Sequence, residues 1–213
     1  MVNGFASFLL EMCNGVVTFL FNRQLLVYVG DLGVVVYGII SNSALIVASI
    51  SNGISQAVQP ILATNYGAGR KSRLKETRHM GEIAVTISGI LFTGIGLLLP
   101  ALVTAAFVKP TAEILAMSVP AVRIYFLSFF AMGFNILYGT YFQSVMKPGY
   151  SLFICMMRGM VINGILVFLL PVAFGVTGIW SVMPVTEFVT LIICRFLLAG
   201  QNKKLPSTGV SGA

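Results

Sequence analysis

The chain has 213 residues, of which 57% are hydrophobic and only 9% are Asp, Glu, Lys or Arg, and its mean hydropathy is +0.95. Soluble domains average about 25% charged residues, so a chain this apolar is expected to lie in a membrane. The net charge of +7 does not indicate nucleic-acid binding, because the basic residues lie at the ends of apolar runs without interleaved aromatic residues. Cys13, Cys155 and Cys194 lie singly in apolar segments, which argues against a disulfide framework or a zinc site.

Six segments are long and apolar enough to cross a bilayer, since a spanning helix needs about 20 mostly apolar residues. They predict an all-α membrane protein with six transmembrane helices. Pro60 is expected to kink or end the second helix, and a first helix that begins almost at Met1 is typical of an internal segment of a longer protein. In chain order, the predicted helices cover about residues 5–29, 34–65, 81–107, 119–146, 150–174 and 178–199, and the polar tail 200–213 is predicted to be disordered.

The connections between these helices differ in their content of Lys and Arg. Those after the second and fourth helices, together with the C-terminal tail, carry eight basic residues, whereas those after the first, third and fifth carry only Lys109. Basic residues stay preferentially in the cytoplasm, so both termini are predicted to be cytoplasmic, with anionic lipid headgroups as neighbours. The eight residues are Arg70, Lys71, Arg73, Lys75 and Arg78, which form one basic loop, and Lys147, Lys203 and Lys204.

The first two predicted helices carry polar side chains at helical spacing, which is costly in lipid unless they face protein or water. Single Ser and Thr residues are explained by hydrogen bonds between helices. Two amide-rich stripes together with an acid instead favour the wall of a polar cavity. The stripes consist of Ser7, Glu11, Asn14, Thr18 and Asn22, and of Asn42, Ser49, Asn52, Gln56 and Gln59. With two residues of the fourth helix added, the predicted substrate cavity is lined by Asn14, Thr18, Asn42, Asn52, Gln56, Asn135 and Tyr138.

Three further charged residues lie deep in predicted helices. Glu11 is about 9 Å inside its helix, where desolvation favours the neutral carboxyl group. A carboxylate that binds a proton or cation on one side and releases it on the other is what a coupled carrier needs, although a neutral, hydrogen-bonded structural Glu is the alternative. Arg158 and Glu187 both need partners, and we predict that they form a structural ion pair with each other.

The sequence carries no enzyme signature. It lacks the G-x-S-x-G, H-E-x-x-H and Walker A patterns, and it has a single His. We therefore expect neither an enzyme nor a resident metal or cofactor, and a transported proton or sodium ion is the only bound ion that we predict.

Four short stretches carry a family resemblance. GISQAVQP at residues 53–60 leads to NYGAGR at 65–70, and YFQSVMKP at 141–148 is followed by GVTGIW at 175–180. In this order and spacing, over nearly the whole chain, they resemble the C-terminal six-helix lobe of the MATE (multidrug and toxic compound extrusion) family of efflux transporters. Glu11 also matches a Glu that some members carry in the seventh helix.

The resemblance implies a transporter of two six-helix lobes around a central cavity that opens alternately to either side of the membrane. Such proteins expel cationic or amphipathic compounds across a bacterial-type cytoplasmic membrane by antiport with protons or sodium. This chain matches only the second lobe, which implies an N-terminal lobe or a second copy as partner. Some members also place an Asp in the tenth helix, whereas the matching helix of this chain has no acid, only Asn135 and tyrosines, so proton coupling through Glu11 is favoured over a two-carboxylate sodium site.

Two alternatives remain open at the level of sequence. The first is a lipid-linked oligosaccharide flippase of the same superfamily, which ranks lower because only Arg158 offers a deep cation. The second is a truncated, non-transporting membrane fragment or scaffold, which the missing first lobe favours.

Overall fold

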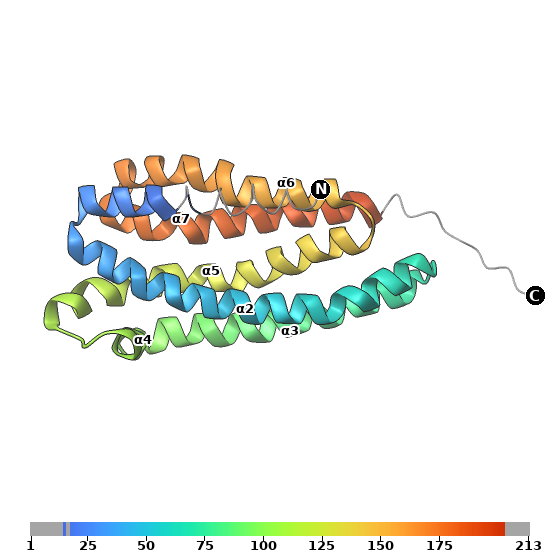
Figure 1. Ribbon diagram of the computed structural model, residues 1–213, viewed down its shortest axis with the longest axis horizontal. Helices are drawn as coiled ribbons and strands as arrows, with labels where there is room; N and C mark the ends of the chain where they lie inside the picture. The colour runs from blue at the N-terminus through green and yellow to red at the C-terminus, as the bar shows by residue number, and fades with distance from the viewer. Residues whose placement is uncertain (1–14, 16–17, 203–213) are drawn as a thin grey trace, which may run out of the picture.

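The computed structural model describes residue 15 and residues 18–202, and every regular element in this part of the chain is helical. Figure 1 shows an elongated bundle whose long helices run roughly along its longest axis. A helix at residues 18–28 is followed by α2 (Asp31–Gly67), α3 (Lys71–Leu98), α4 (Pro100–Phe107), α5 (Ala112–Ser144), α6 (Pro148–Met156), the π-helix η1 (Met157–Ile162) and α7 (Asn163–Asn202).

These elements make six helical limbs, as the apolar runs predict. The helix at 18–28 is the first limb, and α6, η1 and the first part of α7 form the fifth. The predicted helix 81–107 is interrupted at Leu99, where α3 ends, and α4 then lies across the end of the bundle, seen nearly end-on in Figure 1. The sixth begins where Gly175 adopts φ 60° and ψ −138° inside α7. Gly178 then lies so close to the backbone of Leu170 that a side chain there has no room, so glycine makes this reversal possible. Within the described residues, four stretches have the length and composition of membrane spans: Asp31–Gly67, Lys71–Leu98, Ala112–Ser144 and Pro148–Gly200.

The basic cluster predicted as a loop is mostly helical. The third helix begins at Lys71 rather than at residue 81, and only residues 68–70 separate it from α2. Lys, Arg and Glu are good helix formers, so loss of apolar character at the membrane edge does not end a helix. The predicted start at residue 81 was wrong because it was placed where the apolar run begins, and the helix begins earlier, at Lys71.

Two other helix ends also differ from the prediction. The fourth predicted helix begins at Ala112 rather than at residue 119, because the Thr111 hydroxyl accepts a hydrogen bond from the Ile114 amide (3.2 Å) and caps α5. Pro60 lies inside α2, which continues to Gly67.

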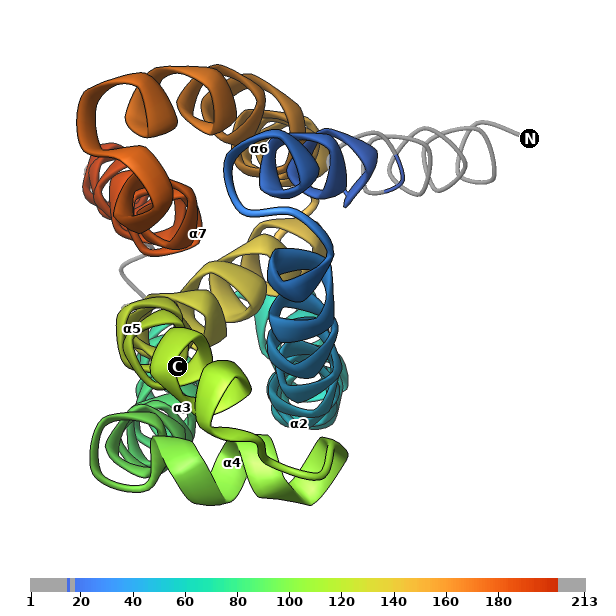
Figure 2. The same ribbon diagram turned by 90° about the vertical axis from the view of Figure 1, so that its left-hand side faces the viewer.

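Helix α5 is the centre of the bundle and contacts α2, α3, α4, α6 and α7. Viewed along the bundle, it lies between α7 on one side and α3 on the other (Figure 2). Its aromatic side chains fit against α3 because α3 presents glycines there: Gly96 lies directly against Phe126, and a Cβ at Gly89 would lie 3.0 Å from the Phe130 backbone. Close backbone approach through small residues is typical of helix packing in membranes.

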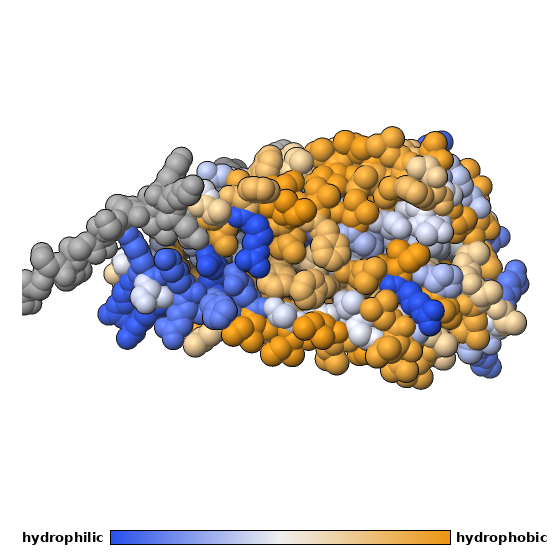
Figure 3. All heavy atoms as spheres, turned by 180° about the vertical axis from the view of Figure 1, so that it is seen from behind, coloured by the Kyte–Doolittle hydropathy of each residue, from blue (hydrophilic) through white to orange (hydrophobic). Residues whose placement is uncertain are grey.

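The outer surface is apolar along most of its length. Figure 3 shows a broad hydrophobic belt and a hydrophilic end, which is formed by the turn between α2 and α3. Large side chains such as Ile87, Ile90 and Leu98 are more than half exposed in this chain. A belt of this kind is stable only in lipid or against other apolar surfaces, as expected of a multi-pass integral membrane protein.

Candidate transport site and buried polar groups

One face of α2 exposes polar side chains along its length. Asn42, Ser49, Asn52 and Gln56 are all exposed, as their spacing predicts for one helix face. Asn42 donates its side-chain amide to the Gly38 carbonyl, and Ser49 donates its hydroxyl to the Leu45 carbonyl, each at 2.8 Å. These two side chains are therefore partly satisfied by their own helix.

Asn52 and Gln56 differ from these two residues. Within the described part of the chain, neither side-chain amide has a hydrogen-bond partner, and both are exposed on a span of high hydropathy. An amide left unsatisfied in hydrocarbon costs several kcal/mol. The face that carries Asn52 and Gln56 must therefore meet water or another protein surface when the chain is in a membrane.

Of the predicted cavity residues in the first helix, only Thr18 is described by the structure. Glu11 and Asn14 lie outside the described residues. Thr18 is exposed, and Phe21 stacks on Tyr37 of α2 with ring centroids 5.3 Å apart. The Tyr37 hydroxyl is a neighbour of Thr18, which brings the described start of the first helix next to α2.

The structure corrects the placement of Asn135 and Tyr138. These residues are only 2% and 0% exposed and lie inside the bundle, so they do not line an open cavity together with the α2 amides. The reason is that α5 is surrounded by other helices, and both side chains contact these neighbours: Asn135 contacts Glu187 of α7, and Tyr138 contacts Glu82 of α3. A signal for this was present in the sequence, because the fourth helix is apolar and aromatic nearly all round, which indicates a buried helix.

Asn135 instead joins Arg158 and Glu187 in a buried network. The Nε and Nη2 atoms of Arg158 both lie 2.7 Å from Oε1 of Glu187, which is fully buried. Asn135 donates its amide to Oε2 of Glu187 at 2.7 Å and to the Glu187 backbone carbonyl at 2.9 Å. The network joins α5, η1 and α7, and it neutralises the one cation that the sequence places deep in the fifth helix.

A second carboxylate has a network that the sequence analysis missed. Tyr138 donates its hydroxyl to Oε1 of Glu82 at 2.9 Å, and the Arg78 Nε lies 3.4 Å from the same oxygen. The Arg195 guanidinium lies over the Tyr138 ring, 5.5 Å from its centroid. The spacing of Arg78 and Glu82 by four residues was the available signal, since such residues are neighbours on a helix. The contact with Tyr138 depends on how α3 and α5 pack.

Known structures share this architecture. The chain matches an outward-facing structure of a multidrug resistance MATE family transporter of the MOP superfamily, with a TM-score of 0.85 and 16% identity over 95% of this chain and 46% of that one. An inward-facing structure of such a transporter matches with a TM-score of 0.85 and 17% identity over 97% and 48%. A MOP superfamily transporter from Pyrococcus furiosus Vc1, described as having a binding pocket of reverse polarity, matches with a TM-score of 0.86 and 17% identity over 96% and 46%.

The chain thus spans about half the length of these structures and has the fold of one of their lobes. A comparison with curated protein sequences found no match. The MatE family model matches residues 5–169. The chain therefore belongs to the MatE family, a family of multi-pass membrane transporters and not of enzymes.

Proposed function

We propose that this chain is the C-terminal half of a cation-coupled antiporter that exports drugs or other cationic or amphipathic organic compounds across a bacterial-type cytoplasmic membrane. The observation that carries the proposal is the exposed pair Asn52 and Gln56 on a membrane-spanning helix. A polar face inside the membrane is a functional feature by default, because lipid does not tolerate it. Family membership supports transport as that function.

A second six-helix lobe would enclose this face. The half-length match to the solved transporters supports such a partner, which is either an N-terminal lobe or a second copy of this chain. The cavity between the lobes would be lined by Thr18, Asn42, Asn52 and Gln56, with Asn14 beside them. These groups would offer hydrogen bonds to a substrate.

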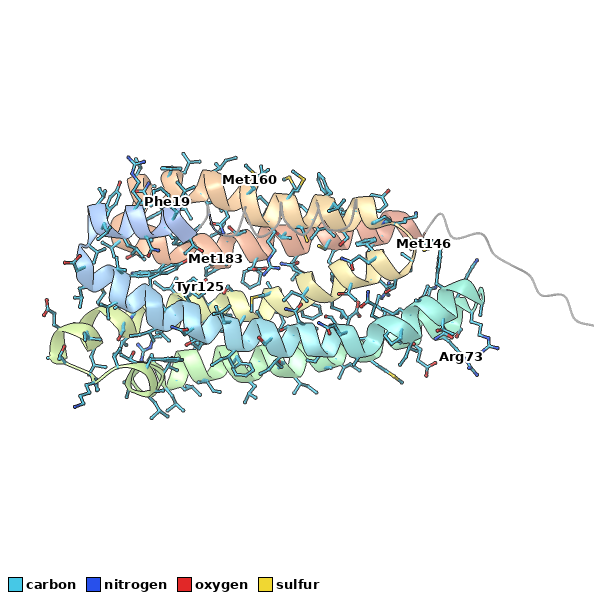
Figure 4. The ribbon with its side chains drawn as sticks, in the orientation of Figure 1. Phe19, Arg73, Tyr125, Met146, Met160 and Met183 are labelled. Atoms are coloured by element: carbon cyan, nitrogen blue, oxygen red, sulfur yellow. The ribbon has the colours of Figure 1, made fainter. Side chains whose placement is uncertain are left out.

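The driving ion would bind at Glu11, with a proton favoured over sodium because Asn135 is not an acid and already donates to Glu187. Both termini would be cytoplasmic. The position of the basic residues supports this orientation. Arg73 and Met146, which directly precedes Lys147 in the α5–α6 turn, lie at the same end of the bundle (Figure 4).

Alternating access would come from rocking the lobe as one body. The chain fits an outward-facing and an inward-facing transporter with the same TM-score of 0.85, which supports a lobe that keeps its internal packing between the two states. The flippase alternative has less support, because Glu187 neutralises Arg158 and leaves it no free charge for a pyrophosphate.

The test is dye efflux from proteoliposomes under an imposed proton gradient and then a sodium gradient. The chain is reconstituted alone and together with an N-terminal MATE lobe. Efflux by the chain alone supports a second copy as the partner, and efflux only after addition of the lobe supports a half-transporter. Correctly inserted protein that gives no gradient-driven efflux in either condition contradicts the proposal.

A further inference from the structure

The turn between α5 and α6 borders a pocket of about 610 Å³ at the basic end of the bundle. Three parts of the chain line it: the turn with Lys147, the first helical turns of α6 with Gly149, Tyr150 and Phe153, and the last turns of α7 with Leu197. The described part of the lining is mostly apolar, and Lys147 is the one charged residue in it. This pocket is separate from the polar face of α2.

The backbone beside the pocket forms the C-terminal cap of α5. Helix α5 ends with hydrogen bonds from the Val145 amide to the Tyr141 carbonyl (3.1 Å) and from the Lys147 amide to the Phe142 carbonyl (3.0 Å). Between them, Met146 has φ 57°, a left-handed conformation that glycine usually occupies at a helix end. The conformation costs about 1–2 kcal/mol for other residues, and Met146 is nevertheless 79% exposed. The Met146 amide also donates to the Gln143 carbonyl (3.3 Å), so Met146 completes a Schellman-type cap that ends α5 beside the pocket.

Lys147 is a partly exposed residue of the pocket lining. Its ammonium group lies 5.6 Å from the Tyr150 ring centroid, which orients the group without neutralising it. Among the described residues, no carboxylate lies within ion-pairing distance of Lys147. The pocket lining therefore combines apolar side chains with one lysine that has no ion-pair partner among the described residues.

The position of the pocket fits the level of lipid headgroups. Figure 4 shows Met146 at the same end of the bundle as Arg73, and Figure 3 shows that the turn between α2 and α3 makes this end hydrophilic. Tyr150 is 40% exposed there, as is common for aromatic side chains at a membrane surface. We propose that this pocket binds one anionic phospholipid, with its phosphate at Lys147 and an acyl chain between Phe153 and Leu197.

Native mass spectrometry of the full chain in detergent, titrated with phosphatidylglycerol and with phosphatidylcholine, tests the proposal. We expect phosphatidylglycerol to bind more tightly, and Lys147→Gln to weaken it about fivefold with little effect on phosphatidylcholine. Gly149→Leu should reduce binding of both lipids, because a Cβ at Gly149 meets nothing within 4 Å and the added side chain has room to fill the pocket. Lys109→Gln and Gly164→Leu are matched controls, since Lys109 is exposed on another turn and Gly164 also has open space around it.

Several results would overturn the proposal. Equal binding of the two lipids, or unchanged binding in both pocket variants, would remove the site. Competition by millimolar inorganic phosphate would indicate a free-anion site instead. A photoreactive residue at position 153 that couples to residues 203–213 rather than to phospholipid would identify the chain's own tail as the occupant. Monodisperse elution of each variant confirms that folding is retained, and photocoupling in the wild-type background does not depend on the substitutions at 147 and 149.

Discussion

Arg158 places both Nε and Nη2 2.7 Å from Oε1 of Glu187, a carboxylate with no exposed surface. The other carboxylate oxygen accepts a hydrogen bond from Asn135. Because Arg158 lies on η1, Glu187 on α7 and Asn135 on α5, one carboxylate braces three helices against each other. The geometry fits the structural ion pair predicted from the sequence, and that role stays a prediction until the pair is removed.

Removal of one partner should be far more harmful than removal of both. Arg158→Met leaves the buried carboxylate unpaired, and the expected loss is about 3–5 kcal/mol. Arg158→Met combined with Glu187→Met replaces the pair by apolar groups of similar size and should recover much of that loss. Thermal unfolding in detergent measures both effects, with the exposed Glu113→Gln as a control. A double variant as unstable as the single one would contradict the ion-pair account.

The glycines of α3 should differ sharply in their tolerance of a side chain. Gly96→Ala places a Cβ against the Phe126 ring, whereas Gly94→Ala meets nothing within 4 Å. Overpacking typically costs about 1–3 kcal/mol, so we expect a lower midpoint of thermal unfolding for Gly96→Ala. Gly94→Ala should match or slightly exceed the wild type, because alanine favours a helix. Equal midpoints for the two variants would mean that the contact between α3 and α5 is looser than described.

The α2 face allows a prediction with an internal control. Asn52→Leu combined with Gln56→Leu removes two exposed amides that have no partner among the described residues, and should reduce gradient-driven dye efflux about tenfold. Ser49→Ala should have little effect, because the Ser49 hydroxyl is already bonded to the Leu45 carbonyl. Unchanged efflux by the double variant, with normal membrane insertion, would exclude these amides from the transport path.

Much of the fold follows from the sequence because lipid imposes simple rules. Apolar runs of the right length gave the six limbs, and the spacing of Asn52 and Gln56 placed them correctly on one face of α2. Helix ends were less predictable, because α3 begins at Lys71, before its apolar region, and Thr111 caps α5 before the apolar region of that helix. Hydropathy locates where a helix enters lipid, not where its hydrogen bonding begins.

The inner placement of α5 could not be read from spacing alone. Asn135 and Tyr138 are three residues apart and share a face of α5, but that face meets other helices of the same lobe. A polar stripe has the same appearance in a sequence whether it faces a cavity or a buried partner. Only the packing of α3 and α7 around α5 shows that Asn135 meets Glu187 and that Tyr138 meets Glu82.

Orientation can be tested by labelling single cysteines. In a chain with its native cysteines replaced by alanine, Lys75→Cys and Lys109→Cys place a thiol on exposed positions in α3 and in the connection after α4. If both termini are cytoplasmic, a membrane-impermeant maleimide added to intact cells should label position 109, and position 75 only after permeabilisation. The reverse pattern would contradict the orientation.

Glu11 is the residue on which coupling depends in the proposed mechanism, and it lies outside the described residues. Glu11→Gln keeps the size of the side chain but cannot exchange a proton, so it should abolish efflux driven by a proton gradient while leaving membrane insertion unchanged. Glu113→Gln removes a different carboxylate, exposed at the start of α5, and should retain efflux. Substrate binding measured without a gradient separates the two roles of the site, because a coupling residue is needed for driven transport but not for equilibrium binding. Efflux at the wild-type rate in Glu11→Gln would remove this residue from the mechanism and leave the α2 face as the only part of the candidate site still supported.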